Sequence, residues 1–258
     1  MKLIFITNDE KIAINADKSW IDRIMVDLEI LWKVERQWHL DTLISKHSIN
    51  DIIKIKKVIK KSKLLVRINP INKKSKDEIE KVIKLWADII MLPMFKTPYE
   101  VKNFIDLIDW RTKNILLLET PQALTRIDDI LNIKWIDEIH IWLNDLHLWM
   151  WLDFMFELLS WWIVEYLSHK INQKNINFWF WWIARIWNWL LDSSLILSEH
   201  KRLKSNWVIL GRDFYKNIEN IKDEVIKVRN IIKNIDINKL DSNKIIVNKI
   251  IKKIININ

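Results

Sequence analysis

Charged side chains end or follow several apolar runs of this 258-residue chain. Asp27 and Glu29 end RIMVDLE, Arg67 ends LLVR, Glu119 ends ILLLE, and Asp145 follows EIHIWLN. Two carboxylates with waters suit Mg²⁺ or Mn²⁺, and an arginine can act as a bidentate cationic clamp on an anionic group. The pattern therefore predicts metal-assisted chemistry on an anionic substrate. Structural roles stay open, because the carboxylates could cap helices or hold hydrogen bonds, and the arginine could form a salt bridge in the barrel.

The elements that must position these residues are eight apolar runs separated by amphipathic stretches. Near-continuous apolar runs are typical of parallel strands buried on both faces, and eight such units favour a closed α/β barrel whose strand ends share one mouth. We predict a (β/α)₈ TIM barrel over residues 1–214 and a C-terminal helical extension over residues 215–258. The predicted strands are Leu3–Thr7, Arg23–Glu29, Leu64–Asn69, Asp88–Pro93, Ile115–Thr120, Glu138–Asn144, Asn177–Trp181 and Trp207–Arg212.

Glycine is nearly absent, whereas tryptophan is abundant: the chain has 1 Gly and 17 Trp. An average protein of this length has about 18 glycines, which serve turns of positive φ and close backbone approaches. Trp20, Trp86 and Trp135 each lie between a helical pattern and the next apolar run, where glycine commonly ends a helix. Two interpretations compete: an unusual aromatic core or binding surface, or glycine encoded by UGA codons taken as tryptophan. The positions follow turns rather than a helical or alternating period, which favours the second.

Four further positions are candidates for substrate binding. Trp142 and Leu143 lie near the end of the sixth predicted strand, and Trp181 and Trp182 lie where the seventh ends, in FWFWWIAR. The barrel backbone approaches ligands at such strand ends, and its N–H groups there often bind phosphate. Real tryptophans at 181 and 182 would block that site. A phosphorylated or carboxylated substrate near Arg185 is a hypothesis from the same stretch.

With Trp read as Gly, stretches such as DRIMVDLE, LLVRINP, ILLLETPQAL and IDEIHIGLNDLHLGMG resemble the HpcH/HpaI aldolase/citrate lyase family over roughly residues 1–214. The resemblance implies a metal-dependent carbon–carbon lyase acting on a 2-oxo acid such as pyruvate, or on a related acyl substrate. Glu119 and Asp145 match the family's metal-binding carboxylates. Arg67 matches the arginine that holds the substrate, and Asp27 and Glu29 match the acidic pair beside the metal water. Family members commonly assemble as homo-oligomers.

One position departs from the family. The aldolases carry a histidine as general base directly after the acidic pair, and here that position is Ile30. Lys33, His39 and His47 are nearby in sequence and could replace it. The departure keeps an alternative open: a non-catalytic or diverged barrel of the same family that serves as a binding protein.

Composition limits the remaining function classes. The net charge is +9, but the lysines are spread over helix faces without interleaved aromatics, so we expect no nucleic-acid partner. The N-terminal apolar run is too short for a signal peptide or a membrane span, so we expect a cytoplasmic protein without a membrane partner. The absence of cysteine excludes thiolate zinc sites and a cysteine nucleophile.

Overall fold

The computed structural model describes residues 1–31, 47–185, 191–215 and 221–256. Within these residues, nine strands form one sheet in the order β7-β6-β5-β4-β3-β2-β1-β9-β8, and every printed pair is parallel. The strands are β1 (Lys2–Ile6), β2 (Arg23–Asp27), β3 (Lys63–Arg67), β4 (Ile89–Leu92), β5 (Lys113–Leu118), β6 (Glu138–Ile141), β7 (Asn177–Phe180), β8 (Trp182–Ile183) and β9 (Trp207–Leu210).

The sheet curls into a nearly closed barrel because one strand joins its two edges. Only Trp181 separates β7 from β8; β7 pairs with β6, and β8 pairs with β9. The backbone N–H of Asn206 donates to the Phe178 carbonyl at 2.8 Å, and Gly211 N–H donates to the Ile183 carbonyl at 2.8 Å. The predicted barrel is confirmed, with one refinement: the seventh strand continues beyond residue 181 as the short β8.

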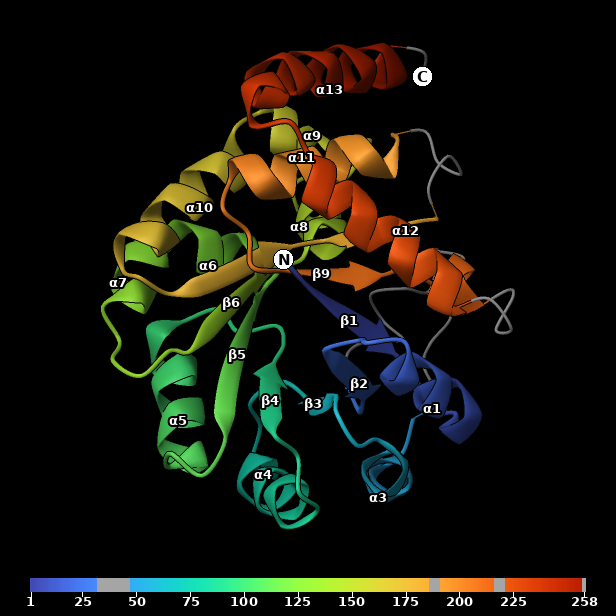
Figure 1. The fold of residues 1–258 in the computed structure, drawn as a ribbon. Coiled ribbons are helices and arrows are strands. Elements are labelled where there is room, and N and C mark those ends of the chain that lie inside the picture. The colour runs from blue at the N-terminus through green and yellow to red at the C-terminus, as the bar shows by residue number, and fades with distance from the viewer. Residues whose placement is uncertain (32–46, 186–190, 216–220, 257–258) are drawn as a thin grey trace.

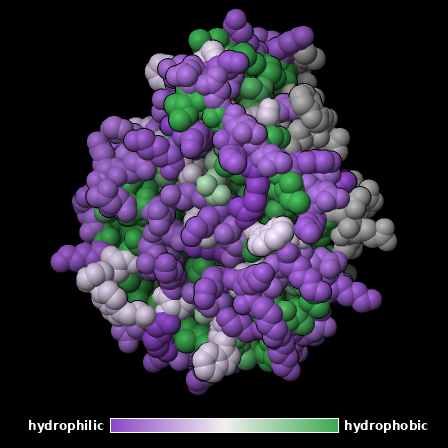
Figure 2. Space-filling view, in the orientation of Figure 1, coloured by the Kyte–Doolittle hydropathy of each residue, from purple (hydrophilic) through white to green (hydrophobic). Residues whose placement is uncertain are grey.

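Helices alternate with the strands and surround the barrel (Figure 1). None of the helices in the described ranges is long and apolar enough to cross a membrane. In the view of Figure 2, hydrophilic side chains cover most of the surface, with separate hydrophobic patches between them. The helices are α1 (Glu10–Lys18), α3 (Ile49–Val58), α4 (Ser75–Lys84), α5 (Pro98–Ile108), α6 (Pro121–Thr125), α7 (Ile127–Leu131), α8 (Leu143–Trp149), α9 (Glu157–Ser160), α10 (Ile163–Gln173), α11 (Ser193–Arg202), α12 (Ile221–Asn234) and α13 (Leu240–Ile255), with 3₁₀ turns at Arg212–Tyr215 and Ile237–Lys239.

The two C-terminal helices pack on the barrel's outer layer. Helix α12 contacts α1 and α11, and α13 lies across α11 and α9 (Figure 1). Val225, Val228, Val247 and Ile251 are their buried apolar side chains, with Ile221 at the start of α12. The predicted C-terminal helices are therefore present and cover α1, α9 and α11.

A repeated αβ turn brings the chain from a helix back to the sheet. A residue of positive φ stands three positions before β2, β4, β5, β6 and β9. In three of these turns the residue of positive φ is the tryptophan of a W-x-D sequence. The aspartate of that sequence accepts a hydrogen bond from a backbone N–H of the neighbouring strand. The pairs are Leu3 N to Asp22 at 2.8 Å, Leu64 N to Asp88 at 2.8 Å, and Asn114 N to Asp137 at 2.9 Å.

Tryptophan occupies most of the left-handed positions. Seven of the eleven residues with positive φ in the described ranges are tryptophan: Trp20, Trp86, Trp110, Trp135, Trp151, Trp162 and Trp181. The left-handed conformation costs a residue with a Cβ roughly 1–2 kcal/mol. Six of the seven side chains are at least half exposed, up to 93% at Trp151, so burial does not offset this cost. These positions have the conformation that favours glycine and lack the packing that favours tryptophan.

Replacing Trp151 by glycine should therefore stabilise this chain. Trp151 has φ of 56°, so we expect Trp151→Gly to raise the unfolding free energy by about 1 kcal/mol and the melting midpoint by roughly 2–4 °C. Trp149 is the matched control, because it lies in α8 without positive φ; Trp149→Gly should destabilise the protein, as glycine does in helices. Calorimetric midpoints decide the matter, and destabilisation by both variants would refute a strained turn at Trp151.

Candidate active site

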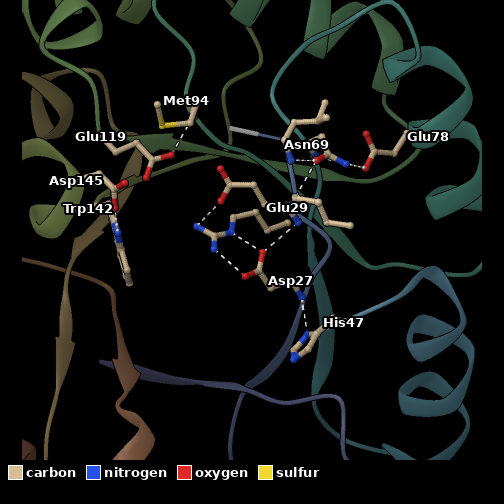
Figure 3. A network of polar contacts seen from close by, with 12 residues as sticks. Asp27, Glu29, His47, Asn69, Glu78, Met94, Glu119, Trp142 and Asp145 are labelled. Carbon is tan, nitrogen blue, oxygen red and sulfur yellow. Dashed lines mark hydrogen bonds and ion pairs between the residues drawn. The ribbon is translucent and has the colours of Figure 1, made fainter. Parts of the chain in front are cut away.

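The guanidinium of Arg67, at the end of β3, forms ion pairs with the buried carboxylates of Asp27 and Glu29, which are both labelled in Figure 3. Its Nε and Nη2 each lie 2.8 Å from an oxygen of Asp27, and its Nη1 lies 3.2 Å from Glu29 Oε2. Burial alone would lower the pKa of Arg67, but the negative charges of Asp27 and Glu29 raise that pKa well above its ordinary value. Arg67 therefore remains a fixed positive charge, oriented by a bidentate contact.

Parallel pairing of β2 and β3 brings these residues together. Asp27 and Arg67 are direct partners in the strand register, and the Leu28 N–H donates to the Arg67 carbonyl at 2.8 Å. Beyond β3, the amide oxygen of Asn69 accepts hydrogen bonds from the N–H groups of Ile30 and Leu31. Asn69 thus fixes the chain just after Glu29. Sequence reasoning missed this positioning role; its one signal is that Asn69 follows Arg67 by two residues.

Glu119 directly follows β5, whereas Asp145 lies in the first turn of α8, four residues beyond the end of the neighbouring strand β6. Both carboxylates are buried, and Figure 3 shows them turned toward each other. Glu119 Oε1 accepts a hydrogen bond from the Met94 N–H at 2.9 Å. Met94 itself has a φ of 55°, so the loop after β4 makes a left-handed turn at this residue. Asp145 Oδ2 accepts the indole N–H of Trp142 at 2.7 Å. The charge of Glu119 also raises the pKa of Arg67, so the two groups belong to one electrostatic site.

The chemistry of this carboxylate pair fits a hard divalent cation. Carboxylate oxygens are the ligands that Mg²⁺ and Mn²⁺ prefer. In the described part of the chain, no group of three or more His, Cys, Asp or Glu residues is arranged to hold a metal ion. Glu119 and Asp145 would therefore hold such an ion together with water and substrate, as Mg²⁺ usually binds proteins through one or two carboxylates.

Of the four positions predicted to bind substrate, Trp142 and Leu143 follow β6, Trp181 follows β7, and Trp182 begins β8. The Trp142 and Trp181 rings lie 4.9 Å apart, and the Trp181 and Trp182 rings lie 5.3 Å apart. Leu143 is fully buried at the start of α8. Trp181 is 2% exposed at a φ of 51°, and its indole N–H has no hydrogen-bond partner among the described residues. The Trp142 indole, bonded to Asp145, occupies space beside that carboxylate.

The ring of Trp182 also lies against Gly211, the only glycine of the chain. A Cβ built on Gly211 would lie 2.7 Å from Cε3 of Trp182 and 2.9 Å from the Ile183 carbonyl oxygen. Both contacts are shorter than side chains tolerate, so residue 211 must be glycine where β8 and β9 meet.

The candidates for a general base differ in their exposure and in their hydrogen-bond contacts. Ile30 is 60% exposed and bears no titratable group. His47 does approach the acidic pair, but its Nδ1 accepts the Asp27 backbone N–H at 2.9 Å. That contact engages the Nδ1 lone pair, and in the neutral ring the proton is then on Nε2. Lys33 and His39 lie outside the described residues.

The Arg185 hypothesis rests on a residue at the edge of the described chain. Its backbone N–H contacts the Asp213 carboxylate, while Nε and Nη2 of its guanidinium are buried and have no hydrogen-bond partner in the described part of the chain. An anion near Arg185 stays a prediction.

The family model described as HpcH/HpaI aldolase/citrate lyase matches residues 3–152, more than half of the chain and all five charged site residues. The chain belongs to this family. Family membership makes a lyase of the aldolase/citrate lyase type the coarse expectation for its activity. No curated protein matches the sequence.

Solved structures of the family share the fold. The HpcH/HpaI aldolase from Desulfitobacterium hafniense DCB-2 superposes with a TM-score of 0.65 at 13% identity, covering 91% of this chain and 93% of that one. A family protein from Burkholderia cenocepacia J2315 gives 0.67 at 10% identity, with 88% and 94% covered. The citrate synthase SbnG gives 0.63 at 15% identity, with 89% and 93% covered. At these identities the likeness is one of fold.

The buried ion-pair network should be essential for stability. We expect Asp27→Ala to lower the unfolding free energy by about 3 kcal/mol or more, because the Arg67 charge would stay buried without its bidentate partner. Asp106, which pairs with Lys102 on the exposed face of α5, is the matched control, and Asp106→Ala should leave the denaturation midpoint almost unchanged. Urea denaturation measures both, and equal midpoints for the two variants would contradict the network described here.

Proposed function

We propose that this protein is a metal-dependent carbon–carbon lyase that acts on a 2-oxo acid such as pyruvate, or on a related acyl substrate. The observation that carries the proposal is the arrangement at the mouth: the fixed cation Arg67 shares one electrostatic site with Glu119, and the buried carboxylate of Asp145 faces that of Glu119 (Figure 3). A negatively charged substrate and a divalent cation are what such a site can hold together.

The proposed roles of the site residues follow from their charges. Glu119 and Asp145 would hold Mg²⁺ or Mn²⁺, which supplies a Lewis acid for stabilising an enolate. Arg67 donates hydrogen bonds to the substrate carboxylate or to the developing enolate oxygen. Asp27 and Glu29 keep its guanidinium charged and aimed at the mouth. Because these groups are preorganised, little reorientation is needed when charge develops on the substrate.

A non-catalytic family barrel is the second candidate, and one observation favours it. Ile30 stands where the family resemblance leads us to expect a base, and His47 presents an engaged Nδ1 to the acidic pair. Such a protein would still bind a metal and a 2-oxo acid without turning over carbon–carbon bonds. Binding and turnover must therefore be measured separately.

We also propose that the tryptophan positions are glycine in the natural protein, as UGA codons taken as tryptophan would produce. Seven left-handed tryptophans support this, and six of them are largely exposed. The buried, unpartnered indole N–H groups of Trp179 and Trp181 support it further, because buried indoles usually find an acceptor. Glycine at residues 142, 181 and 182 would open the mouth beside Glu119 and Asp145.

Substitution of the charged residues should distinguish a lyase from a non-catalytic family barrel. We expect Glu119→Gln to abolish Mn²⁺-dependent cleavage or formation of carbon–carbon bonds with pyruvate, and Arg67→Met to lower kcat/KM by about 100- to 1000-fold. Asp106→Asn, on the exposed face of α5, should retain the activity of the parent. Full activity in Glu119→Gln would sink the lyase proposal. Glu119-dependent metal binding with no turnover on any 2-oxo acid would favour the binding protein.

Peptide mass spectrometry of protein isolated from its own source tests the glycine assignment. Peptides that contain residues 20, 86, 110, 135 and 151 should carry the mass of glycine at each of those positions. Peptides without such positions should keep their expected masses and serve as the control. Sequencing of the coding DNA should find UGA at these codons. Peptides with intact tryptophan masses would overturn the assignment.

A further inference from the structure

His140 is a buried polar side chain inside the barrel that the proposed mechanism does not use. It lies on β6 and is 1% exposed. Neither Nδ1 nor Nε2 has a hydrogen-bond partner within the part of the chain that the structure describes. Buried polar atoms are nearly always paired, and an unpaired one costs about 1–3 kcal/mol. A ring with two unpaired nitrogens therefore indicates a partner other than the protein.

Two tryptophan rings cover the imidazole. Trp179 stacks on it with centroids 4.8 Å apart, and Trp142 meets it edge-on at 5.4 Å. The Trp142 indole also donates to Asp145 at 2.7 Å. One side chain thus extends from the imidazole to a carboxylate of the proposed metal site. If residue 142 is glycine, the volume of that indole joins His140 to the site.

We infer that His140 forms the polar floor of the substrate pocket and hydrogen-bonds a hydroxyl group of the bound 2-oxo acid. The inference rests on the proposed function and on glycine at residues 142 and 179. It makes His140 a residue that determines specificity, because an unsubstituted acid leaves the ring nitrogens unpaired and a hydroxylated acid pairs one of them. A pocket built to bond a hydroxyl discriminates against the analogue that lacks it.

The protonation state of the ring agrees with an uncharged partner. Burial and the nearby positive charge of Arg67 lower the pKa of His140 well below its ordinary value. The neutral ring then offers one N–H donor and one acceptor nitrogen. A hydroxyl, which both donates and accepts, matches either one, whereas a second carboxylate would be better met by a cation.

The test compares pyruvate with hydroxypyruvate, which differ by one hydroxyl on C3. Titration calorimetry with Mn²⁺ would use the full chain with glycine at its 17 tryptophan positions. We expect hydroxypyruvate to bind about three- to tenfold more tightly than pyruvate, as one net hydrogen bond provides. His140→Phe should remove this preference, while His140→Asn should keep part of it.

A second readout separates recognition from folding. Without ligand, His140→Phe should have a melting midpoint equal to or above that of the parent, because it deletes an unpaired buried group. Equal affinities for the two acids in the parent, or a preference that survives in His140→Phe, would overturn the inference while leaving the lyase proposal intact. If neither acid binds in a Glu119-dependent way, the proposed function fails, and the inference fails with it.

Discussion

The left-handed turn that returns the chain from a helix to five of the barrel's strands is the constraint on which the rest of the structure depends. It recurs three residues before β2, β4, β5, β6 and β9. The aspartate two residues later in the W-x-D turns then bonds the neighbouring strand. Each turn therefore fixes the residue at which its strand begins. Because the strands pair in parallel register, this also fixes which residues lie at the carboxyl end of the strand.

That register is what assembles the mouth. Asp27 and Arg67 are direct register partners, and Glu119 and Asp145 follow the adjacent strands β5 and β6. The network is buried, so its charges are not screened by water and each must be paired or used. Arg67 is held by two carboxylates, whereas neither ring nitrogen of His140 has a hydrogen-bond partner among the described residues. Tryptophan, the residue type of the turns, also stands next to the site, where the Trp142 indole is bonded to Asp145.

Local pattern was enough to predict the strands and the charged residues at their ends, because apolar runs and strand-end charges are properties of short segments. Contacts that join distant segments were not predictable in this way. The Met94 N–H reaches Glu119 only because β4 ends in a left-handed turn. The amide oxygen of Asn69, which lies just beyond β3, accepts hydrogen bonds from the backbone N–H groups of residues 30 and 31, which follow β2. The imidazole of His47 accepts a hydrogen bond from the backbone N–H of Asp27, 20 residues earlier in the chain. The break at Trp181 that splits the seventh strand depends on pairing with both barrel edges.

We propose that glycine at the turn and mouth positions leaves Glu119 and Asp145 open to a divalent cation. Titration calorimetry with Mn²⁺ can compare two otherwise identical chains, one with tryptophan and one with glycine at the 17 positions. We expect saturable binding to the glycine chain and at least tenfold weaker binding, a difference of about 1.4 kcal/mol or more, to the tryptophan chain, whose Trp142 indole engages Asp145. Equal binding to both chains, or no binding to the glycine chain, would contradict this proposal.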